Sequence, residues 1–452
     1  MISISQRQLD LKKIKEIYEK LIVTKVETAI HDFVQKENTY LRHPDTWVQD
    51  AYKITVSFLE RYGLYGAALS VGDLRANILK YLVDGETDPQ RYLEGIILSF
   101  WRCAADVCMD RIISDNGKTI DYLTDEDIVA LSKWEGIKKK ALGQTNQNKR
   151  REILKDALNQ RTCWLFSNTA KKDVMEWQSG FRSMEDEELN AIVLIPSLTN
   201  ALHREEKRNG ALDLLEGIFD YDDILNRVLV AGTPRHQLLS AMNVPVCPYC
   251  NRQYITLFSN RKKGGKTRTN PVKETTADLD HFYIKSKYPY LSLSLYNFIP
   301  SCQICNSRFK GTMDFYVYPH VYPYKDEFGD GVKFTTKLDA FQSGDKGIIE
   351  LINYSGNEAV QNSISTFMLE EVYQSHSAYV QDIQRKAEKY NKEMIESLKS
   401  QFGDLLGDNR SIMDDLYGQY LDRTKFYLRP LAKLTRDILA ECYGDEIEWE
   451  NI

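Results

Sequence analysis

Residues 247–258 read CPYCNRQYITLF and residues 277–311 read ADLDHFYIKSKYPYLSLSLYNFIPSCQICNSRFKG, and the fold is organised around these two stretches. They contain two Cys-x-x-Cys pairs, Cys247/Cys250 and Cys302/Cys305. Four thiolates suit a tetrahedral zinc ion, and each pair supplies two ligands from one tight turn. Because 51 residues separate the two pairs, against roughly 15–20 in a simple zinc ribbon, we expect folded structure between them.

The segment between the cysteine pairs predicts two strands followed by a helix. Residues 277–283 are short, alternating and aromatic, and residues 292–300 form a second alternating run. Residues 303–310 indicate a short helix that ends at Gly311. Polar groups on a strand and on an adjacent strand or helix could therefore converge on one bound cation.

Four polar residues of this segment suit the hydrolysis of a phosphodiester. A neutral His281 can take a proton from water, and activity would then rise with pH through an apparent pKa of about 6–7. Asp280 and Asn306 offer oxygen ligands for one Mg²⁺ or Mn²⁺, which would stabilise charge on the phosphate oxygens. Asn297 lies within the apolar run between them.

The same segment is basic. Residues 251–310 contain eleven Lys and Arg against three Asp and Glu, whereas the whole chain has a formal net charge of −6. A basic segment in an acidic protein suits a polyanion that is bound through its phosphates. We predict contacts to DNA from Arg252, Lys262, Lys263, Lys266, Arg268, Lys285, Lys287, Arg308 and Lys310. For the polar insert over residues 259–276, a merely solvated loop is an equal alternative.

Together these residues resemble the motif of an HNH endonuclease of the ββα-metal type, in its His-Asn-Asn variant. The resemblance covers about 65 of the 452 residues. It implies that His281 is the general base and that Asp280 and Asn306 are ligands of the catalytic Mg²⁺ or Mn²⁺. It also implies that the side chain of Asn297 ties the loop between the strands, and that the four cysteines hold a structural Zn²⁺.

A wider and weaker resemblance extends from about residue 240 to 440. The stretches LDHFYIKSKYP, SLYNFIPSC, VYPYKDEFGD and RPLAKLTRDIL are similar to bacterial HNH proteins of anti-phage systems, the Septu type above all. This implies a nuclease effector that acts with an SMC-like or ABC-type ATPase. The chain has no phosphate-binding Gly-x4-Gly-Lys-Ser/Thr loop, so ATP would bind to the partner. The helical N-terminal region departs from the short members of that group.

Other interpretations of the motifs stay open. The tetrapeptide CPYC also occurs in glutaredoxins, although a strand-like run and a second cysteine pair follow it here. A zinc-bearing adaptor that binds nucleic acid without cutting it is a second alternative. A stand-alone restriction-type HNH nuclease is a third, with the helical N-terminal region reading the DNA. Loss of cleavage with retained binding in His281→Ala separates the enzyme from the adaptor.

The whole chain predicts an α+β protein that is mainly helical, with the nuclease core embedded in it. Residues 1–235 predict a mainly helical region for recognition or partner binding, and residues 236–345 the nuclease domain with its zinc site. Residues 346–452 predict a helical region with one long helix over residues 365–402. This C-terminal region either packs onto the nuclease or pairs with a second copy in a homo-oligomer.

The composition indicates the cellular compartment of the protein. Four of the eight cysteines lie scattered outside the zinc pattern, which indicates a reducing compartment and no disulfide framework. The first twenty residues are polar and amphipathic, unlike a signal peptide, and no apolar run is long enough to span a membrane. We therefore expect a cytoplasmic protein.

Overall fold

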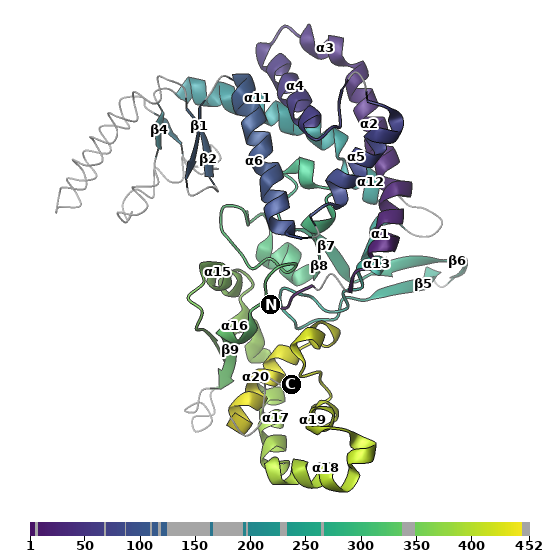
Figure 1. Ribbon diagram of the computed structural model, residues 1–452, viewed down its shortest axis with the longest axis vertical. Helices are drawn as coiled ribbons and strands as arrows, with labels where there is room; N and C mark the ends of the chain where they lie inside the picture. Colours follow the sequence, from purple (N-terminus) through teal and green to yellow (C-terminus); the bar gives the residue numbers. More distant parts are fainter. Residues whose placement is uncertain are drawn as a thin grey trace, which may run out of the picture.

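The computed structural model is mainly helical, with small antiparallel hairpins, and is consistent with the predicted α+β class (Figure 1). The structure describes residues 1–4, 8–66, 69–85, 87–108, 111–115, 119–123, 163–165, 193–195, 198–226, 233–263, 266–336 and 349–444. Within these ranges no helix is both long and apolar enough to cross a membrane.

The N-terminal region is a set of packed helices, as predicted. Asp10 and Ser70 cap two of them, each accepting a hydrogen bond from the backbone N–H three residues on. The helices are α1 (Leu11–Ile17), η2 (Tyr18–Val23), α2 (Thr24–Gln35), α3 (Glu37–Leu41), α4 (Thr46–Arg61), α5 (Val71–Val83), α6 (Pro89–Cys108), α11 (Leu198–Ile218) and α12 (Tyr221–Leu225). Two small antiparallel sheets pair β1 (Arg111–Asp115) with β2 (Thr119–Leu123) and β3 (Cys163–Leu165) with β4 (Val193–Ile195).

The central part of the chain contains the cysteine pairs. Its elements are α13 (Pro234–Met242), β5 (Leu257–Lys263), β6 (Lys266–Thr275), β7 (Ala277–His281), η4 (Pro289–Leu291), η5 (Leu295–Asn297), β8 (Phe298–Cys302) and the short helix η6 (Ile304–Lys310). Strands β7 and β8 are antiparallel, with Ala277 opposite Cys302 and His281 opposite Phe298. The predicted helix end at Gly311 is confirmed, because this residue adopts φ +51°, a conformation that glycine tolerates best.

The second predicted strand is shorter than the sequence indicates. It starts only at Phe298, and the residues before it form the turns η4 and η5. The leucines of the alternating run are buried, but so are the serines between them, Ser292 and Ser294. A segment that is buried on all sides does not need the extended geometry that places alternate residues in water.

The polar insert is a hairpin in which β5 pairs with β6 in antiparallel fashion. The pairing register shifts between Asn260 and Lys262, and the last pair is Lys263 with Lys266. Figure 1 shows this hairpin extending to one side of the molecule. The pairing places the cationic positions on two adjacent strands.

The C-terminal region begins with η7 (Gly329–Gly331) and the antiparallel pair β9 (Val332–Thr336) and β10 (Ile349–Asn353), which confirms the short β region expected there. Helices follow: α15 (Glu358–Thr366), α16 (Leu369–Tyr373), η8 (Gln374–His376), α17 (Ser377–Lys389), α18 (Lys392–Leu406), α19 (Asn409–Tyr417), η9 (Arg423–Leu428) and α20 (Ala432–Tyr443).

The single long helix predicted over residues 365–402 is wrong. Met368 adopts φ +46° between α15 and α16, where a right-handed helix cannot continue. The tight turn Gln374–His376 changes the helical geometry again. The side chain of Asn391 then accepts a hydrogen bond from the backbone N–H of Met394 and starts a new helix. The apolar stripe correctly predicted that this segment is helical. The breaks do not interrupt the stripe, so the hydrophobic pattern does not reveal them.

One continuous apolar core joins the N-terminal helices to the central loop before β8. Buried tyrosines link the two parts, because their rings pack in the core while their hydroxyls satisfy backbone carbonyls. Tyr18 of η2 donates to the carbonyl of Leu293 at 2.9 Å, and Tyr81 of α5 donates to that of Tyr290 at 2.8 Å. The helical region therefore holds the loop that connects β7 to β8.

Candidate functional site

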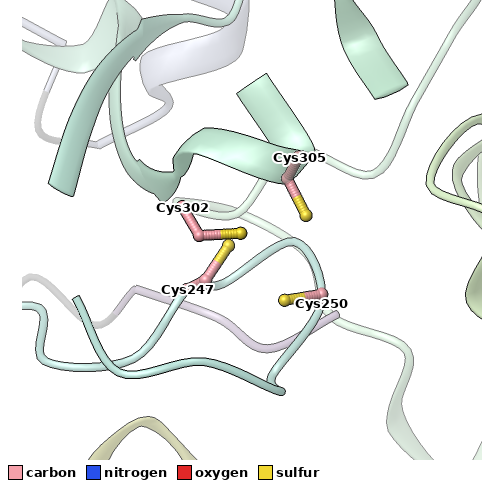
Figure 2. Close-up of side chains that lie close together, drawn as sticks. All are labelled: Cys247, Cys250, Cys302 and Cys305. Atoms are coloured by element: carbon pink, nitrogen blue, oxygen red, sulfur yellow. The ribbon is translucent and has the colours of Figure 1, made fainter. Parts of the chain in front are cut away.

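The four cysteines of the two Cys-x-x-Cys pairs form one buried cluster, in which all four sulfur atoms lie within 4.8 Å of one another. Figure 2 shows two of them on the loop that contains Cys247 and Cys250, and the other two at the end of β8 and on η6. The loop is a tight turn in which Asn251 adopts φ +48° and donates its backbone N–H to the carbonyl of Cys247.

The cluster fits a structural zinc ion. Zinc prefers four soft donors in a closed tetrahedron, and four buried sulfur atoms at this separation supply that donor set. Among the residues that the structure describes, this is the group of His, Cys, Asp and Glu side chains suited to a metal. The prediction that the four cysteines meet in one cluster is confirmed.

Segments from both ends of the chain cover the cysteine turn. The backbone N–H of Ile2 donates to the carbonyl of Pro248 at 3.0 Å. From the C-terminal region, Tyr373 donates its hydroxyl to the carbonyl of Cys250 at 2.7 Å. Asn251 donates its side-chain amide to the carbonyl of Phe426 at 3.1 Å. The C-terminal helices therefore pack onto the metal centre.

His281 lies at the other end of the β7–β8 hairpin and is buried, with 8% of its surface exposed. Its Nε2 lies 2.9 Å from the carbonyl oxygen of Ser292. Because a carbonyl oxygen only accepts, Nε2 carries the proton and Nδ1 carries the lone pair. The ring of Tyr221, from α12, contacts the imidazole edge-on with centroids 4.7 Å apart.

Burial lowers the pKa of His281 from its ordinary 6.5 to about 4, against the raising effects of the Ser292 carbonyl and the Asp280 carboxylate. The apparent pKa of about 6–7 that is expected for the activity stays a prediction. The imidazole is neutral near pH 7, as a general base requires, but it is a weaker base than a solvated histidine.

Asp280 is engaged by two buried donors. The Nζ of Lys310 lies 2.8 Å and 2.9 Å from its two carboxylate oxygens, and the hydroxyl of Tyr249 lies 2.6 Å from Oδ2. The side chains of Lys310 and Asp280 are 1% and 5% exposed. Lys310 also donates to the backbone carbonyl of His281. Burial lowers the pKa of Lys310, and the adjacent carboxylate opposes this.

Asn306 contacts Asp278 rather than Asp280, with its Nδ2 3.1 Å from Oδ2 of Asp278. The spacing explains this pairing. Asp278 and Asp280 lie two residues apart, on one face of β7, and span about 6.6 Å. Asn306 and Lys310 lie four residues apart on η6, close to one turn of this π-helix, so both lie on the same side of it. Each helix residue therefore meets its own acid on the strand.

This arrangement does not fit Asp280 and Asn306 as a ligand pair for a catalytic cation. Both oxygens of Asp280 accept hydrogen bonds from Lys310, and one also accepts from Tyr249. The amide of Asn306 is turned toward Asp278, which also pairs with Arg235 at 3.4 Å. The positive charge beside Asp280 is the ammonium of a lysine.

The side chain of Asn297 is fully buried and makes three hydrogen bonds across the loop between the strands. Its Oδ1 accepts from the backbone N–H of Tyr283 at 2.8 Å. Its Nδ2 donates to the carbonyls of Tyr283 and Leu291 at 3.0 Å and 3.1 Å. These bonds join the start of the loop to its middle, next to the His281 position.

The residues predicted to contact DNA differ in their exposure and in their ion-pair partners. Arg308 is exposed on η6. Lys285 pairs with Asp222 at 2.6 Å, and Lys287 pairs with Asp314 at 3.3 Å. The surface role predicted for Lys310 is corrected, because its ammonium is buried against Asp280.

The remaining predicted contacts lie on the cysteine turn and on the hairpin. The Nε of Arg252 lies 3.1 Å from Nε2 of His376, so this side chain joins the cysteine turn to the C-terminal region. Four positions lie on β5 and β6, where the structure describes the strands but not these side chains: Lys262, Lys263, Lys266 and Arg268.

Sequence reasoning missed the partners of the site. Tyr249 stands inside the Cys-Pro-Tyr-Cys motif and Asp278 stands two residues before Asp280, so strand periodicity could have suggested the second. Lys310 follows Asn306 by one helical turn, a spacing that also indicates a shared face. For Tyr221, sixty residues upstream of His281, no local signal exists.

Comparison of the chain with protein-family models, with curated proteins and with solved structures finds no match.

Proposed function

We propose that this protein is an endonuclease that hydrolyses DNA phosphodiester bonds, with His281 as the general base. One observation carries the proposal: two antiparallel strands and a short helix form a unit closed by four cysteines at one end. Strand β7 of this unit carries Asp280 and His281 and lies against η6, whose Asn306 contacts Asp278 and whose Lys310 contacts Asp280. The HNH motif of the sequence has the same order of parts.

In the proposed reaction His281 takes a proton from water at Nδ1. The hydrogen bond from Nε2 to the carbonyl of Ser292 holds the tautomer and the orientation of the ring. The ring of Tyr221 covers the imidazole in the closed arrangement. Substrate would reach His281 only after α12 moves aside, and entry of water would return the pKa of His281 toward 6.5, closer to the value that suits a general base.

No step of this mechanism passes through Mg²⁺ or Mn²⁺, because both carboxylate oxygens of Asp280 accept hydrogen bonds from Lys310. The positive charges next to the reaction are those of the chain itself, with Lys310 beside the Asp280-His281 dipeptide and exposed Arg308 on the same helix. The four cysteines would hold zinc as a structural ion. Cleavage assays with EDTA, Mg²⁺ and Mn²⁺ test the metal dependence that the family resemblance implies.

The resemblance to HNH effectors of Septu-type systems leads us to propose a role in anti-phage defence with an SMC-like or ABC-type ATPase as partner. The covered His281 supports a nuclease that is silent until something opens it, which a sensor ATPase could provide. The activity assay should therefore include an ATPase encoded next to this protein, together with ATP.

The decisive experiment compares the wild type with His281→Ala in plasmid cleavage and in a DNA mobility-shift assay. We expect His281→Ala to lose cleavage and to keep binding, since the imidazole acts on water and not on the phosphates. His31→Ala, at an exposed histidine, is the matched control and should cut like the wild type. A wild-type protein that binds DNA with its partner and ATP but never cuts it would establish the non-catalytic adaptor instead.

A further inference from the structure

The least exposed ion pair at the candidate site joins two elements that are distant in sequence. Lys310 comes from η6 and Asp280 from β7, and both side chains are almost fully buried. The ammonium also contacts the ring of Phe315, 4.9 Å from its centroid. The hydroxyl of Tyr249 completes the coordination of the carboxylate. Taking such charges out of water is costly, so they are held only if each is well partnered.

Three contacts converge on one dipeptide. Lys310 binds the Asp280 side chain and the backbone carbonyl of His281, so a single ammonium restrains both residues. Tyr249 also donates to Asp280. It precedes Asp280 in the chain, whereas Lys310 follows it, and it stands between Cys247 and Cys250 of the cysteine cluster. The ring of Tyr249 stacks on Phe367, with centroids 4.5 Å apart, which leaves it little freedom to turn.

We propose that Lys310 and Tyr249 are positioning residues of the candidate active site, and that the Lys310 ammonium holds the place beside Asp280 that the family resemblance gives to a divalent cation. The role in an active site rests on the proposed function, whereas the ion pair between Lys310 and Asp280 does not. Asp280 is then a buried anchor that fixes His281, and the cysteine centre acts on it through Tyr249.

The molecule contains a matched control for this ion pair. Lys433 and Asp437 of α20 are 4% and 5% exposed, with Nζ 2.8 Å from Oδ2. Lys433 also donates to a backbone carbonyl, that of Gly329 at 2.9 Å, as Lys310 does to that of His281. Variants of this second pair measure what a buried Lys–Asp pair contributes without contacting Asp280 or His281.

The first test is a double-mutant cycle of Asp280→Asn and Lys310→Met, followed by chemical denaturation without DNA. Each single change leaves one buried charge alone, so we expect the unfolding constant to rise about a hundredfold or more. The double variant removes both charges and should be far more stable than the product of the single effects predicts. Additive effects would overturn the pairing.

The second test is Mn²⁺ binding, counted by electron paramagnetic resonance on the folded, DNA-free protein. We expect the wild type, Asp280→Asn and the double variant to bind Mn²⁺ equally, because the place beside Asp280 belongs to Lys310. A tenfold or greater loss of Mn²⁺ affinity in Asp280→Asn would overturn the proposal and make Asp280 a metal ligand. Both measurements stand whether or not the protein cuts DNA.

The third test asks whether the pair positions His281. We expect Lys310→Met and Tyr249→Phe to shift the imidazole resonances of His281 in histidine-labelled protein, and to lower kcat for cleavage without raising KM for DNA. Lys433→Met should cost similar stability and do neither. Tyr288→Phe is the control for Tyr249, since Tyr288 is buried and donates to a different acid, Asp314, at 2.9 Å. If the imidazole resonances of His281 do not shift in either variant, Lys310 and Tyr249 only stabilise the fold and do not position His281.

Discussion

The two ends of the β7–β8 hairpin behave differently. At the end where Ala277 pairs with Cys302, four cysteines meet as their spacing in the sequence implies. At the end where His281 pairs with Phe298, the residues singled out by the motif are present but have partners that the motif does not name. Asp280 binds Lys310 and Tyr249, Asn306 binds Asp278, and His281 lies under Tyr221.

This contrast shows how far a ligand pattern can be trusted. Four thiols in two tight turns have few other partners in a protein interior, so a shared metal is their natural use. A carboxylate or an amide can instead pair with any lysine, arginine, tyrosine or acid that the fold brings near. The packing of elements that are far apart in sequence decides which of these groups forms the hydrogen bond or ion pair.

The largest expected effect concerns the cysteine end. Cys302→Ser should give insoluble or protease-sensitive protein, because a structural zinc site contributes on the order of 10 kcal/mol. Elemental analysis of the wild type should find one zinc per chain. Cys442→Ser, at an exposed cysteine outside the cluster, should leave zinc content and stability unchanged. A stable Cys302→Ser protein, or a wild type without zinc, would rule out a metal centre at this end of the hairpin.

A smaller effect is expected when acid is applied to the histidine end. The pKa of His281 is lowered from 6.5 to about 4 by burial, so above pH 6.5 both the folded and the unfolded states are neutral there. Between these values only the unfolded state binds the proton, so stability falls as pH falls, by about 3 kcal/mol in total. His281→Gln should lose this part of the pH dependence when unfolding is followed at about pH 7 and about pH 4.

The control for this measurement is His31→Gln, at an exposed histidine, which should keep the acid dependence of the wild type. His320, whose pKa burial also lowers to about 4, stays in both variants and contributes equally to each. Identical acid sensitivity in His281→Gln and the wild type would show that His281 is already solvated.

The third prediction tests what keeps the histidine end closed, by uncovering His281. Tyr221→Ala removes the ring that covers the imidazole, so water should enter and the pKa of His281 should rise from about 4 toward 6.5. Titration of the His281 resonance by NMR measures this directly. Tyr354→Ala, at an exposed tyrosine, should leave it unchanged. A pKa that stays at about 4 would mean that elements other than α12 keep the ring dry.

The smallest expected effect concerns the β5–β6 hairpin. Replacing Lys262, Lys263, Lys266 and Arg268 with glutamine should weaken DNA binding and flatten its salt dependence, by a slope of roughly 0.9 for each phosphate that the variant no longer neutralises. The slope of log affinity against log salt, from mobility shifts, is the measurement. Replacing four exposed cations of α17 and α18, Arg385, Lys389, Lys392 and Lys399, is the charge-matched control. An unchanged slope would mean that the hairpin is only solvated.

The amino-acid sequence alone was enough to predict the elements whose signals are local. The helical stripes of the N-terminal region, the β region after residue 332 and the helix end at Gly311 follow from residue periodicity and from the conformational freedom of glycine. The cysteine cluster also belongs here, because sulfur donors at Cys-x-x-Cys spacing carry their chemistry with them.

The other features depend on tertiary packing. The breaks at Met368 and Gln374–His376 divide an apolar stripe that by itself predicts one helix, since a helical stripe does not report single backbone angles. The alternating serines before β8 predict a strand with one exposed face, but these serines are buried and no strand forms there. The pairing of Lys310 with Asp280 and the cover of Tyr221 over His281 arise between distant elements, where burial makes each unpaired charge costly and so selects the partner.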